Sequence, residues 1–402
     1  MRYGALSKFF QSVAAKRLTV VEVDPTKSNG REINAKPDLR ALLGPETIRQ
    51  ATGRFFFFSS SSPPVSDDSK FSWYDARRNQ PHREPEWRFY YGKNKIIDLA
   101  SEGDLCIIAR RSNGEVIVIV SEKGSDYESS FSYLFGITST DAELTLFDTE
   151  VAVDFVSATI LEEIGIEPPE PEAERIDRLV ARFGLTFPTT KIMSDLARRT
   201  AQAPDSREDP DAALLAWLEM EEALFRRIER RIVAARLDHG FRNQGEADVD
   251  GFLQFSLSVQ NRRKSRMGFS LENHVEAILD AHGLRYTRGA RTEGNSKPDF
   301  LFPGADEYGD PAFPAARLTM LGVKSTLKDR WRQVLAEAAR ISPKHLLTLA
   351  PGVSAAQADE MARHALVLVA PRPLRDRLAP GGRAGLIDLR GFLRTVAGRQ
   401  NA

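Results

Sequence analysis

Three residues in the C-terminal half of the chain have side chains that could hydrolyse a phosphodiester. Asp299 follows a proline, Lys324 ends an apolar run, and Glu337 lies further along. Aspartate and glutamate bind hard divalent cations through oxygen, and a neighbouring lysine can orient water or offset charge at a phosphate. A bound cation polarises a phosphate and lowers the pKa of a bound water. The set predicts a metal-dependent nuclease site in which Asp299 and Glu337 hold Mg²⁺.

Each of these residues also has an ordinary structural explanation. Asp299 can cap a turn, Lys324 can extend its stem over apolar surface, and Glu337 can be a surface residue. An Asp…Lys…Glu set is a weak pattern, so spacing alone leaves both interpretations open. Glu272, expected in the first turn of another helix, could join the acidic cluster as a catalytic residue or only favour that helix's dipole.

Basic residues cluster near these candidates. Segment 328–332 could read a G·C-rich major groove, because arginine donates to guanine and aspartate accepts from cytosine N4. Segment 261–266 suits phosphate contacts. The alternatives are a charged helix start for the first segment and a solvated loop for the second. The residues predicted to contact DNA are Arg262, Arg263, Lys264, Lys328, Asp329, Arg330 and Arg332, whereas Trp331 is expected in the core.

Alternating helices and strands must position these residues. The pattern predicts strands over 300–302, 318–324, 345–349 and 365–370, and helices over 270–282, 327–341 and 355–364. This alternation favours a mixed or parallel sheet covered by helices. Asp299 and Lys324 would then meet at one sheet edge, with Glu337 facing them from the 327–341 helix. A long amphipathic helix over 211–236 is expected before them.

Residues 1–160 have mainly the pattern of strands. The β-branched run 18–23 predicts a strand, and Asn113-Gly114 between two apolar runs predicts a hairpin. Segment 59–69 is polar and is expected to be a loop. The proline-rich and acidic segment that follows residue 165 has the composition of a linker. The domains expected are therefore 1–165 and 176–402, joined by a linker over 166–175.

Composition narrows the function classes. The formal net charge of the 402 residues is zero, so any nucleic-acid surface must be local. The single cysteine, Cys106, excludes an internal disulfide framework and fits a reducing compartment. No segment approaches the roughly 20 apolar residues that span a bilayer, and the N-terminus lacks the apolar core of a signal peptide. We expect a cytoplasmic protein with no membrane partner.

Three blocks closely resemble the EcoRII family of type II (type IIE) restriction endonucleases, namely Val259–Arg266, Thr292–Pro303 and Val323–Gln333. The resemblance spans roughly residues 175–402. It implies a PD-(D/E)xK restriction-endonuclease-like α/β domain that is a homodimer and needs Mg²⁺. It also implies cleavage of both strands of a short double-stranded DNA site flanked by CC and GG (CCWGG-like), which leaves 5′ overhangs.

The resemblance also assigns residues. Asp299 becomes the metal-binding aspartate, Lys324 the lysine of the motif, and Glu337 a glutamate displaced onto the helix. This displacement explains why Gly322, and not an acid, stands two positions before Lys324.

The N-terminal part resembles the family's plant-type DNA-binding pseudobarrel. That domain binds an effector copy of the site and covers the catalytic cleft until the effector is bound, so autoinhibition is implied. The implied effector-DNA contacts are Lys27, Asn29, Arg31, Arg77, Arg78, Arg83 and Arg88. Because these loops depart from the family's sequences, two alternatives remain: a nuclease for modified DNA, and a DNA-binding regulator with an inactive nuclease domain.

Overall fold

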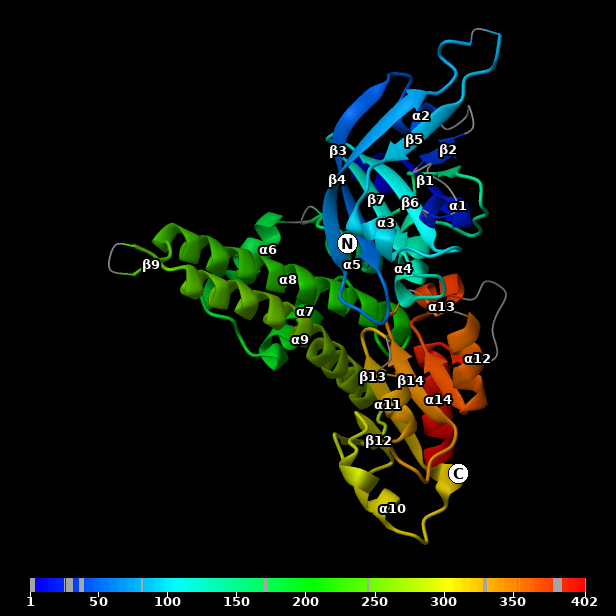
Figure 1. Cartoon of the computed structure of the whole chain (residues 1–402). Coiled ribbons are helices and arrows are strands. Elements are labelled where there is room, and N and C mark those ends of the chain that lie inside the picture. The colour runs from blue at the N-terminus through cyan, green and yellow to red at the C-terminus, as the bar shows by residue number, and fades with distance from the viewer. Residues whose placement is uncertain are drawn as a thin grey trace. The chain divides into compact units, whose positions relative to one another are not determined.

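The computed structural model describes residues 4–24, 26, 32–35, 40–80, 82–168, 173–243, 246–327, 331–350, 352–353, 355–378 and 385–401. The chain divides into two compact units (Figure 1). The N-terminal unit comprises residues 2–169 with 351–357, and the C-terminal unit comprises residues 170–350 with 358–402.

The N-terminal unit is built on one sheet in the order β2-β5-β4-β3-β7-β6-β1-β8. Its strands are β1 Phe10–Arg17, β2 Glu32–Ala35, β3 Ile48–Phe58, β4 Val65–Asp75, β5 Trp87–Tyr91, β6 Leu105–Arg111, β7 Val116–Ser121 and β8 Thr145–Phe147. All neighbours are antiparallel except β3 and β7. The helices are α1 Val20–Val23, α2 Arg40–Leu43, α3 Lys95–Leu99, α4 Asp126–Phe135 and α5 Phe155–Glu163. The sheet is open, since β2 and β8 form its edges, and the predicted β-rich fold is confirmed.

Aromatic side chains hold this sheet together. Residues at alternate positions point to the same face of a strand, and Phe71 and Trp73 of β4 are buried in this way. They stack on β5, where the Trp73 and Trp87 ring centroids lie 5.1 Å apart and those of Phe71 and Phe89 lie 5.2 Å apart. The pairing of such rings across adjacent strands stabilises the register of the sheet.

Of the three local predictions for this unit, one is confirmed and two need correction. The hairpin is confirmed, with Gly114 at the positive φ of 87° that its turn requires. The strand predicted over 18–23 is wrong, because Thr19 and Glu22 form a capping box that starts helix α1. The loop predicted over 59–69 is too long, since strand β4 already begins at Val65.

Helices form the first part of the C-terminal unit: α6 Ala173–Val180, α7 Thr190–Thr200, α8 Pro210–His239 and α9 Val249–Ala281. The long helices α8 and α9 lie side by side and form a two-helix arm (Figure 1), with the short strands β9 Arg242–Asn243 and β10 Glu246–Ala247 between them. Residues Leu214, Leu218, Leu224 and Ile228 of α8 are buried, which confirms the amphipathic helix predicted over 211–236.

The helix predicted to start at Ser270 begins instead at Val249. Asp248 caps it by accepting the N–H of Gly251 at 2.9 Å, and Ser270 is buried well inside the helix. Arg263 and Arg266 bind Glu229 and Glu222 of α8. These ion pairs lie along segment 261–266, for which a solvated loop was one of the two alternatives.

The second part is a mixed sheet in the order β11-β12-β13-β14-β15-β16. Its strands are β11 Thr287–Arg288, β12 Phe300–Phe302, β13 Thr319–Lys324, β14 Lys344–Thr348, β15 Leu366–Val369 and β16 Leu386–Ile387. Strands β13 to β16 are parallel, and β11 and β12 join them antiparallel. The accompanying helices are α10 Ala305–Gly309, α11 Trp331–Leu335, α12 Ala355–Arg363, α13 Arg372–Leu378 and α14 Leu389–Asn401. The predicted α/β fold is confirmed.

The helix predicted over 327–341 is much shorter than expected. Helix α11 ends at Leu335, and Ala338 takes a left-handed φ of 48° that no right-handed helix contains. No helix in the described part of the chain is long and apolar enough to cross a membrane.

Candidate active site

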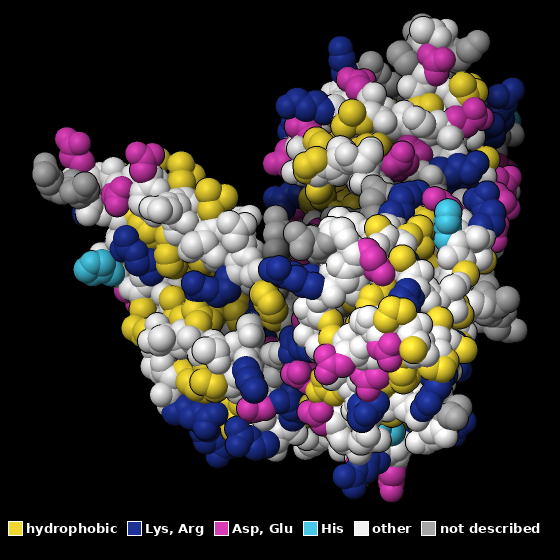
Figure 2. Space-filling view, turned by 90° about the horizontal axis from the view of Figure 1, so that it is seen from below, with side chains coloured by type: hydrophobic (Ala, Val, Ile, Leu, Met, Phe, Trp, Pro, Cys, Tyr) yellow, Lys and Arg dark blue, Asp and Glu magenta, His cyan; other side chains and the backbone are white. Residues whose placement is uncertain are grey.

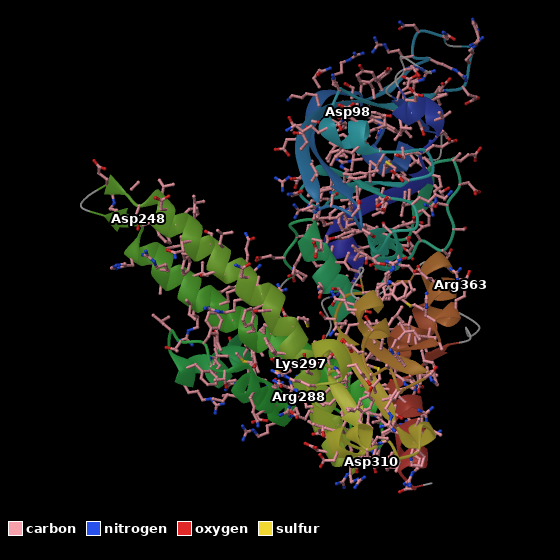
Figure 3. The ribbon with its side chains drawn as sticks, turned by 60° about the horizontal axis from the view of Figure 1, so that its bottom comes forward. Asp98, Asp248, Arg288, Lys297, Asp310 and Arg363 are labelled. Atoms are coloured by element: carbon pink, nitrogen blue, oxygen red, sulfur yellow. The ribbon has the colours of Figure 1, made fainter. Side chains whose placement is uncertain are left out.

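Asp299 and Lys324 meet at one edge of the mixed sheet. Strand β12 runs antiparallel to β13, so the start of β12 and the end of β13 lie together. Lys324 Nζ donates to Asp299 Oδ2 at 2.9 Å, and the backbone N–H of Val323 donates to the same oxygen at 2.6 Å. The structure therefore brings together the aspartate and lysine that the sequence indicated. Figure 3 marks this region with the labels of Lys297 and Arg288.

Glu337 stands close to both residues, on the turn that follows α11. Burial raises the pKa of its carboxyl group to about 7, the negative charge of Asp299 raises it too, and Lys324 and Lys344 lower it. Its Oε2 atom is buried and has no hydrogen-bond partner within the described residues. A buried carboxylate oxygen without a donor is costly unless a cation or solvent satisfies it.

Packing around Gly322 leaves little room for a second carboxylate two positions before Lys324. A Cβ atom at this position would lie 3.0 Å from Cγ2 of Val334 on α11 and 3.5 Å from Leu346. A side chain two positions before Lys324 would therefore contact Val334 more tightly than is usual, and Val334 would have to move slightly. Glu337, three residues after Val334, supplies a carboxylate without using this space.

These residues fit a magnesium ion better than a transition metal. Mg²⁺ keeps several waters and is held by one or two carboxylates together with substrate phosphate oxygens, which matches Asp299 and Glu337. A site formed by three or more His, Cys, Asp or Glu side chains does not occur in the described ranges.

Glu272 lies far inside α9 and not in a first turn, which corrects its expected location. Its carboxylate accepts from Arg288 of β11 at 2.9 Å. The same guanidinium donates to Asn273 at 3.0 Å and to Glu276 at 2.8 Å. Arg288 thus ties α9 to the strand beside β12, while the backbone N–H of the next residue, Gly289, donates to Asp299 O at 3.0 Å.

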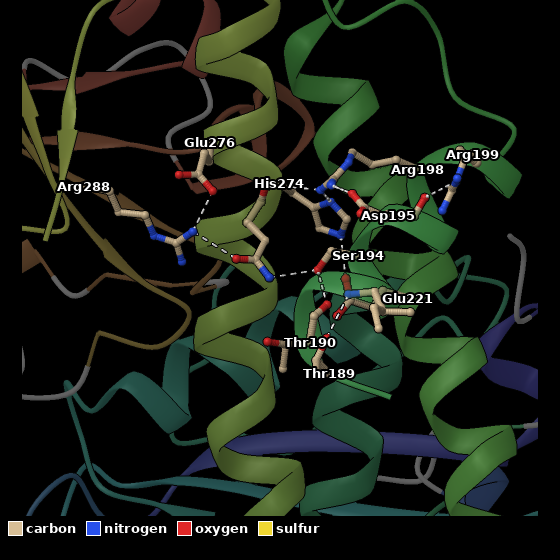
Figure 4. Close-up of polar contacts among 12 residues, drawn as sticks. Thr189, Thr190, Ser194, Asp195, Arg198, Arg199, Glu221, His274, Glu276 and Arg288 are labelled. Atoms are coloured by element: carbon tan, nitrogen blue, oxygen red, sulfur yellow. Dashed lines mark hydrogen bonds and ion pairs between the residues drawn. The ribbon is translucent and has the colours of Figure 1, made fainter. Parts of the chain in front are cut away.

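A buried polar network continues from Asn273 into the helices (Figure 4). Asn273 donates to Ser194 at 3.1 Å, and fully buried His274 lies 2.9 Å from the equally buried Glu221. Arg198 Nη1 lies 3.3 Å from the other ring nitrogen of His274. The network links α7, α8 and α9 with β11, so the helices and the strand that flanks the site are held as one unit.

Part of the C-terminal unit is similar to known proteins. Residues 225–393 match the family model described as EcoRII C terminal. The type II restriction enzyme EcoRII of Escherichia coli is 45% identical over 191 residues, which cover 47% of this chain and 46% of that protein. Residues 225–393 are therefore similar to the EcoRII C-terminal family. The resemblance stated from the residues is confirmed, over about half the length of the curated relative.

Two solved structures show lower similarity. Metal-depleted Ecl18kI in complex with uncleaved, modified DNA has a TM-score of 0.45 and 17% identity, and the match covers 57% of this chain and 85% of that one. The B3 domain of the UbaLAI restriction endonuclease with cognate DNA has a TM-score of 0.20 and 19% identity, over 35% of this chain and 91% of that one. At these TM-scores we draw nothing from either structure.

Within residues 225–393, the predicted phosphate-binding residues lie on helix α9. Arg262 is exposed and its guanidinium lies 4.1 Å from the Phe187 ring centroid. Arg263 donates to Glu229 at 2.6 Å. The side chain of Lys264 lies outside the described residues. Both described arginines therefore already have a partner on the protein.

The predicted base-reading segment is only partly described. Lys328, Asp329 and Arg330 lie outside the described residues. Arg332 is half-exposed, pairs with Glu360 of α12 at 3.0 Å, and lies 4.6 Å from the Trp331 ring centroid. Trp331 is fully buried, as predicted. Glu337 lies beyond the end of α11, so the prediction that it shares one helix with this segment is wrong.

Among the predicted effector contacts, Lys27, Asn29 and Arg31 lie outside the described residues. Arg77 and Arg88 both pair with Glu86, Arg88 at 2.7 Å, and Arg88 also pairs with Glu32. Arg78 and Arg83 are exposed.

Sequence inspection missed four residues around Glu337, namely Glu293, Tyr308, Arg340 and Lys344. Lys344 begins β14, donates to the carbonyl of Leu335, and lowers the pKa of Glu337. The other three hold the turn that carries Glu337. Their proximity depends on tertiary folding, and the only available signal was that Glu293 lies within the block that resembles the family.

Replacing Glu337 by glutamine should stabilise the metal-free protein at pH 8. The folded-state pKa lies above the unfolded value, so stability is highest below the unfolded pKa of 4.5 and falls as the pH rises toward about 7. With 1.36 kcal/mol per pKa unit and allowance for solvent screening, Glu337→Gln should gain about 1–2 kcal/mol at pH 8 and little at pH 4.5.

Urea unfolding at both pH values, in the presence of a chelator, measures this difference. Glu360→Gln, at an exposed ion pair, serves as the control and should show no gain at pH 8. A Glu337→Gln protein that is less stable than the wild type at pH 8 would contradict the proximity of the two carboxylates.

Proposed function

We propose that this chain is a Mg²⁺-dependent type II restriction endonuclease that cuts double-stranded DNA. The observation that supports it most is the joint placement of Asp299, Lys324 and Glu337 inside the region that matches the EcoRII C-terminal family model. Glu337 there has a buried oxygen without a hydrogen-bond partner among the described residues. The 45% identity with the type II restriction enzyme EcoRII over 191 residues supports the same chemistry. An intact set of three polar residues argues against an inactive DNA-binding regulator.

The side chains have distinct roles in this proposal. Asp299 and Glu337 would hold Mg²⁺, which when bound lowers the pKa of a water and offsets charge on the phosphate. Lys324 lies beside Asp299 and would place its ammonium where the phosphate gains negative charge. Such a preorganised charge favours the transition state over the ground state. The N–H of Val323 fixes Asp299, so the carboxylate does not need to reorient during the reaction.

For the target, we propose a short site flanked by CC and GG, cut to leave 5′ overhangs. Support comes from the family resemblance of segment 323–333 and from Arg332, whose planar guanidinium suits guanine. Because Arg332 pairs with Glu360 in the free protein, binding of DNA would have to replace this ion pair. Such an exchange favours DNA that offers two acceptors in one plane, as guanine does.

Replacing Lys324 by alanine should abolish cleavage and leave DNA binding largely intact. Loss of one charge that acts mainly in the transition state lowers a rate by about 100–1,000-fold. The test incubates purified protein with Mg²⁺ and a sequenced plasmid, and measures filter binding without metal in parallel. Lys191→Ala, at an exposed lysine of α7, should cut like the wild type. Continued cleavage by the Lys324 variant would show that the site is wrongly assigned.

We further propose that the N-terminal domain binds an effector copy of the site and inhibits the catalytic domain until it does so. The domain limits proposed are 1–165 and 176–402, with 166–175 as a linker, in a cytoplasmic enzyme. Of the predicted effector contacts that the structure describes, Arg78 and Arg83 are exposed and could contact effector phosphates. The division of the chain into two compact units makes a regulatory arrangement possible.

A plasmid with a single site should be cut slowly by the full chain, and faster when an oligonucleotide that carries the site is added. Deletion of residues 1–170 should raise the single-site rate and remove the effect of the oligonucleotide. The rates are measured by gel from time courses, after circular dichroism has shown that the fragment is folded. Equal single-site rates for the full chain and a folded fragment would rule out autoinhibition.

We also propose that the enzyme is a homodimer, because cutting both strands requires two copies of a site that occurs once in each chain. Val249, Leu253 and Leu257 lie one turn apart on α9 and are 61%, 52% and 59% exposed. Figure 2 shows hydrophobic side chains on the surface of the arm at the left. An exposed apolar patch of this kind marks an interaction site, and a two-fold dimer would bury the same patch of both copies.

The double substitution Leu253→Asp and Leu257→Asp should convert the dimer to monomers and abolish double-strand cleavage. Burying a charged residue in an apolar interface costs several kcal/mol, as for any unpaired buried charge. Sedimentation velocity measures the change. Leu185→Asp, at an isolated leucine that is 58% exposed, is the matched control and should remain dimeric. A dimeric double variant would exclude this face of α9 from the interface.

A further inference from the structure

We propose that Glu293, Tyr308 and Arg340 are positioning residues that set where the Glu337 carboxylate stands relative to Asp299. The inference rests on the proposed Mg²⁺-dependent function, and it assigns to these residues control over how tightly the metal is held. None of the three belongs to the Asp299, Lys324 and Glu337 set.

The turn after α11 needs support from outside itself. Ala338 is buried and has a φ of 48°, a conformation that costs free energy in a residue with a Cβ atom. The turn's backbone N–H groups do not continue the helix. The N–H of Ala338 points to Thr292 Oγ1 at 3.4 Å. The N–H of Ala339 points to Glu293 Oε2 at 3.3 Å, and that of Arg340 points to Tyr308 Oη at 3.5 Å. The acceptors come from two other segments of the chain, which therefore hold the turn.

Glu293 and Tyr308 are joined to each other. The Tyr308 hydroxyl donates to the two carboxylate oxygens of Glu293 at 2.5 and 2.6 Å. Burial raises the pKa of Tyr308 to about 12, with a further contribution from Glu293, so the phenol remains a donor at neutral pH. The hydrogen bond to Tyr308 lowers the pKa of Glu293, which keeps that carboxylate charged. The pair thus presents a fixed set of acceptors to the turn.

Arg340 holds the same turn from its other end. Its guanidinium donates to the carbonyl oxygens of Asp310 and Phe313 at 2.9 Å each, and also to that of Tyr308. These carbonyls belong to α10 and the segment after it, which the label of Asp310 locates in Figure 3. A lysine at this position would lack the planar guanidinium that binds these three carbonyl oxygens in one fixed geometry.

The position of the Glu337 carboxylate in the proposed metal site depends on the backbone of the turn that carries it. Its Oε2 has no hydrogen-bond partner within the described residues, so the backbone of the turn mainly determines where the carboxylate lies. Glu293 lies on the segment that leads through Pro298 to Asp299. One segment therefore holds both metal-binding carboxylates, and displacement of Glu293 or Tyr308 changes the spacing between them.

The test measures Mn²⁺ binding to the full chain from the electron paramagnetic resonance signal of free Mn²⁺. Tyr308→Phe removes one hydroxyl group and leaves the ring, and Arg340→Lys keeps the charge but loses the fork. Each should weaken Mn²⁺ binding by about 10-fold, as loss of groups that orient metal ligands does. In cleavage assays each should raise the half-saturating Mg²⁺ concentration by a similar factor, with the rate recovered at high Mg²⁺.

Tyr286→Phe is the matched control. It removes the same hydroxyl group, which here donates to Asp280 at 2.7 Å, from a tyrosine that does not contact the turn. It should leave Mn²⁺ binding unchanged. In a Glu337→Gln background, Tyr308→Phe should weaken Mn²⁺ binding by less than twofold, because the group it positions is absent. A general structural defect would instead weaken binding in both backgrounds.

Each outcome of the Mn²⁺-binding and cleavage measurements either supports or overturns the inference. Mn²⁺ binding by Tyr308→Phe and Arg340→Lys within twofold of the wild type would overturn it, and so would equal weakening with and without Glu337. A wild-type chain that binds no Mn²⁺ would overturn both the inference and the metal site. A chain that binds Mn²⁺ through Glu337 but cuts no DNA would refute the proposed function and leave the positioning role supported.

Discussion

The site depends on one carboxylate oxygen, Oδ2 of Asp299, that accepts from two donors of the neighbouring strand. Lys324 and the Val323 N–H both reach it because β12 runs antiparallel to β13 and brings the start of one strand to the end of the other. The contact with Asp299 holds the Lys324 ammonium at this sheet edge. The other parts of the C-terminal unit are arranged around this sheet edge.

Packing on the sheet then determines where the second carboxylate can stand. Val334 packs closely over Gly322 and leaves little room for a larger side chain there, and the second acid, Glu337, lies on the turn after the helix. The turn places Glu337 near Asp299, where burial and like charge raise its pKa to about 7. The protein thus keeps a carboxylate in a place that disfavours its charged form, as expected where a cation is to be bound. If Glu337 binds the proposed Mg²⁺, metal binding would restore the stability that the raised pKa of Glu337 costs the metal-free protein.

The sequence contained enough to find the strands and the Asp299–Lys324 contact, because both follow from local periodicity and from a lysine at a strand end. The sequence did not predict the turn that carries Glu337. Segment 327–341 has a helical pattern, yet the N–H groups at 338 and 339 bond to Thr292 and Glu293, which only folding brings near. The same holds for α9: Ser270 resembles a helix cap, but Arg263 and Arg266 pair with α8 along a continuous helix. In both places tertiary contacts outweighed a local signal.

The most direct test of the central claim is to sequence the ends that the purified protein produces on plasmid DNA, with Mg²⁺ and with a chelator. If Asp299, Lys324 and Glu337 form a metal-dependent restriction site, the ends with Mg²⁺ will map to one short recurrent sequence with 5′ overhangs, and none will form with the chelator. Ends scattered over many sequences, or cleavage that persists in the chelator, would contradict it.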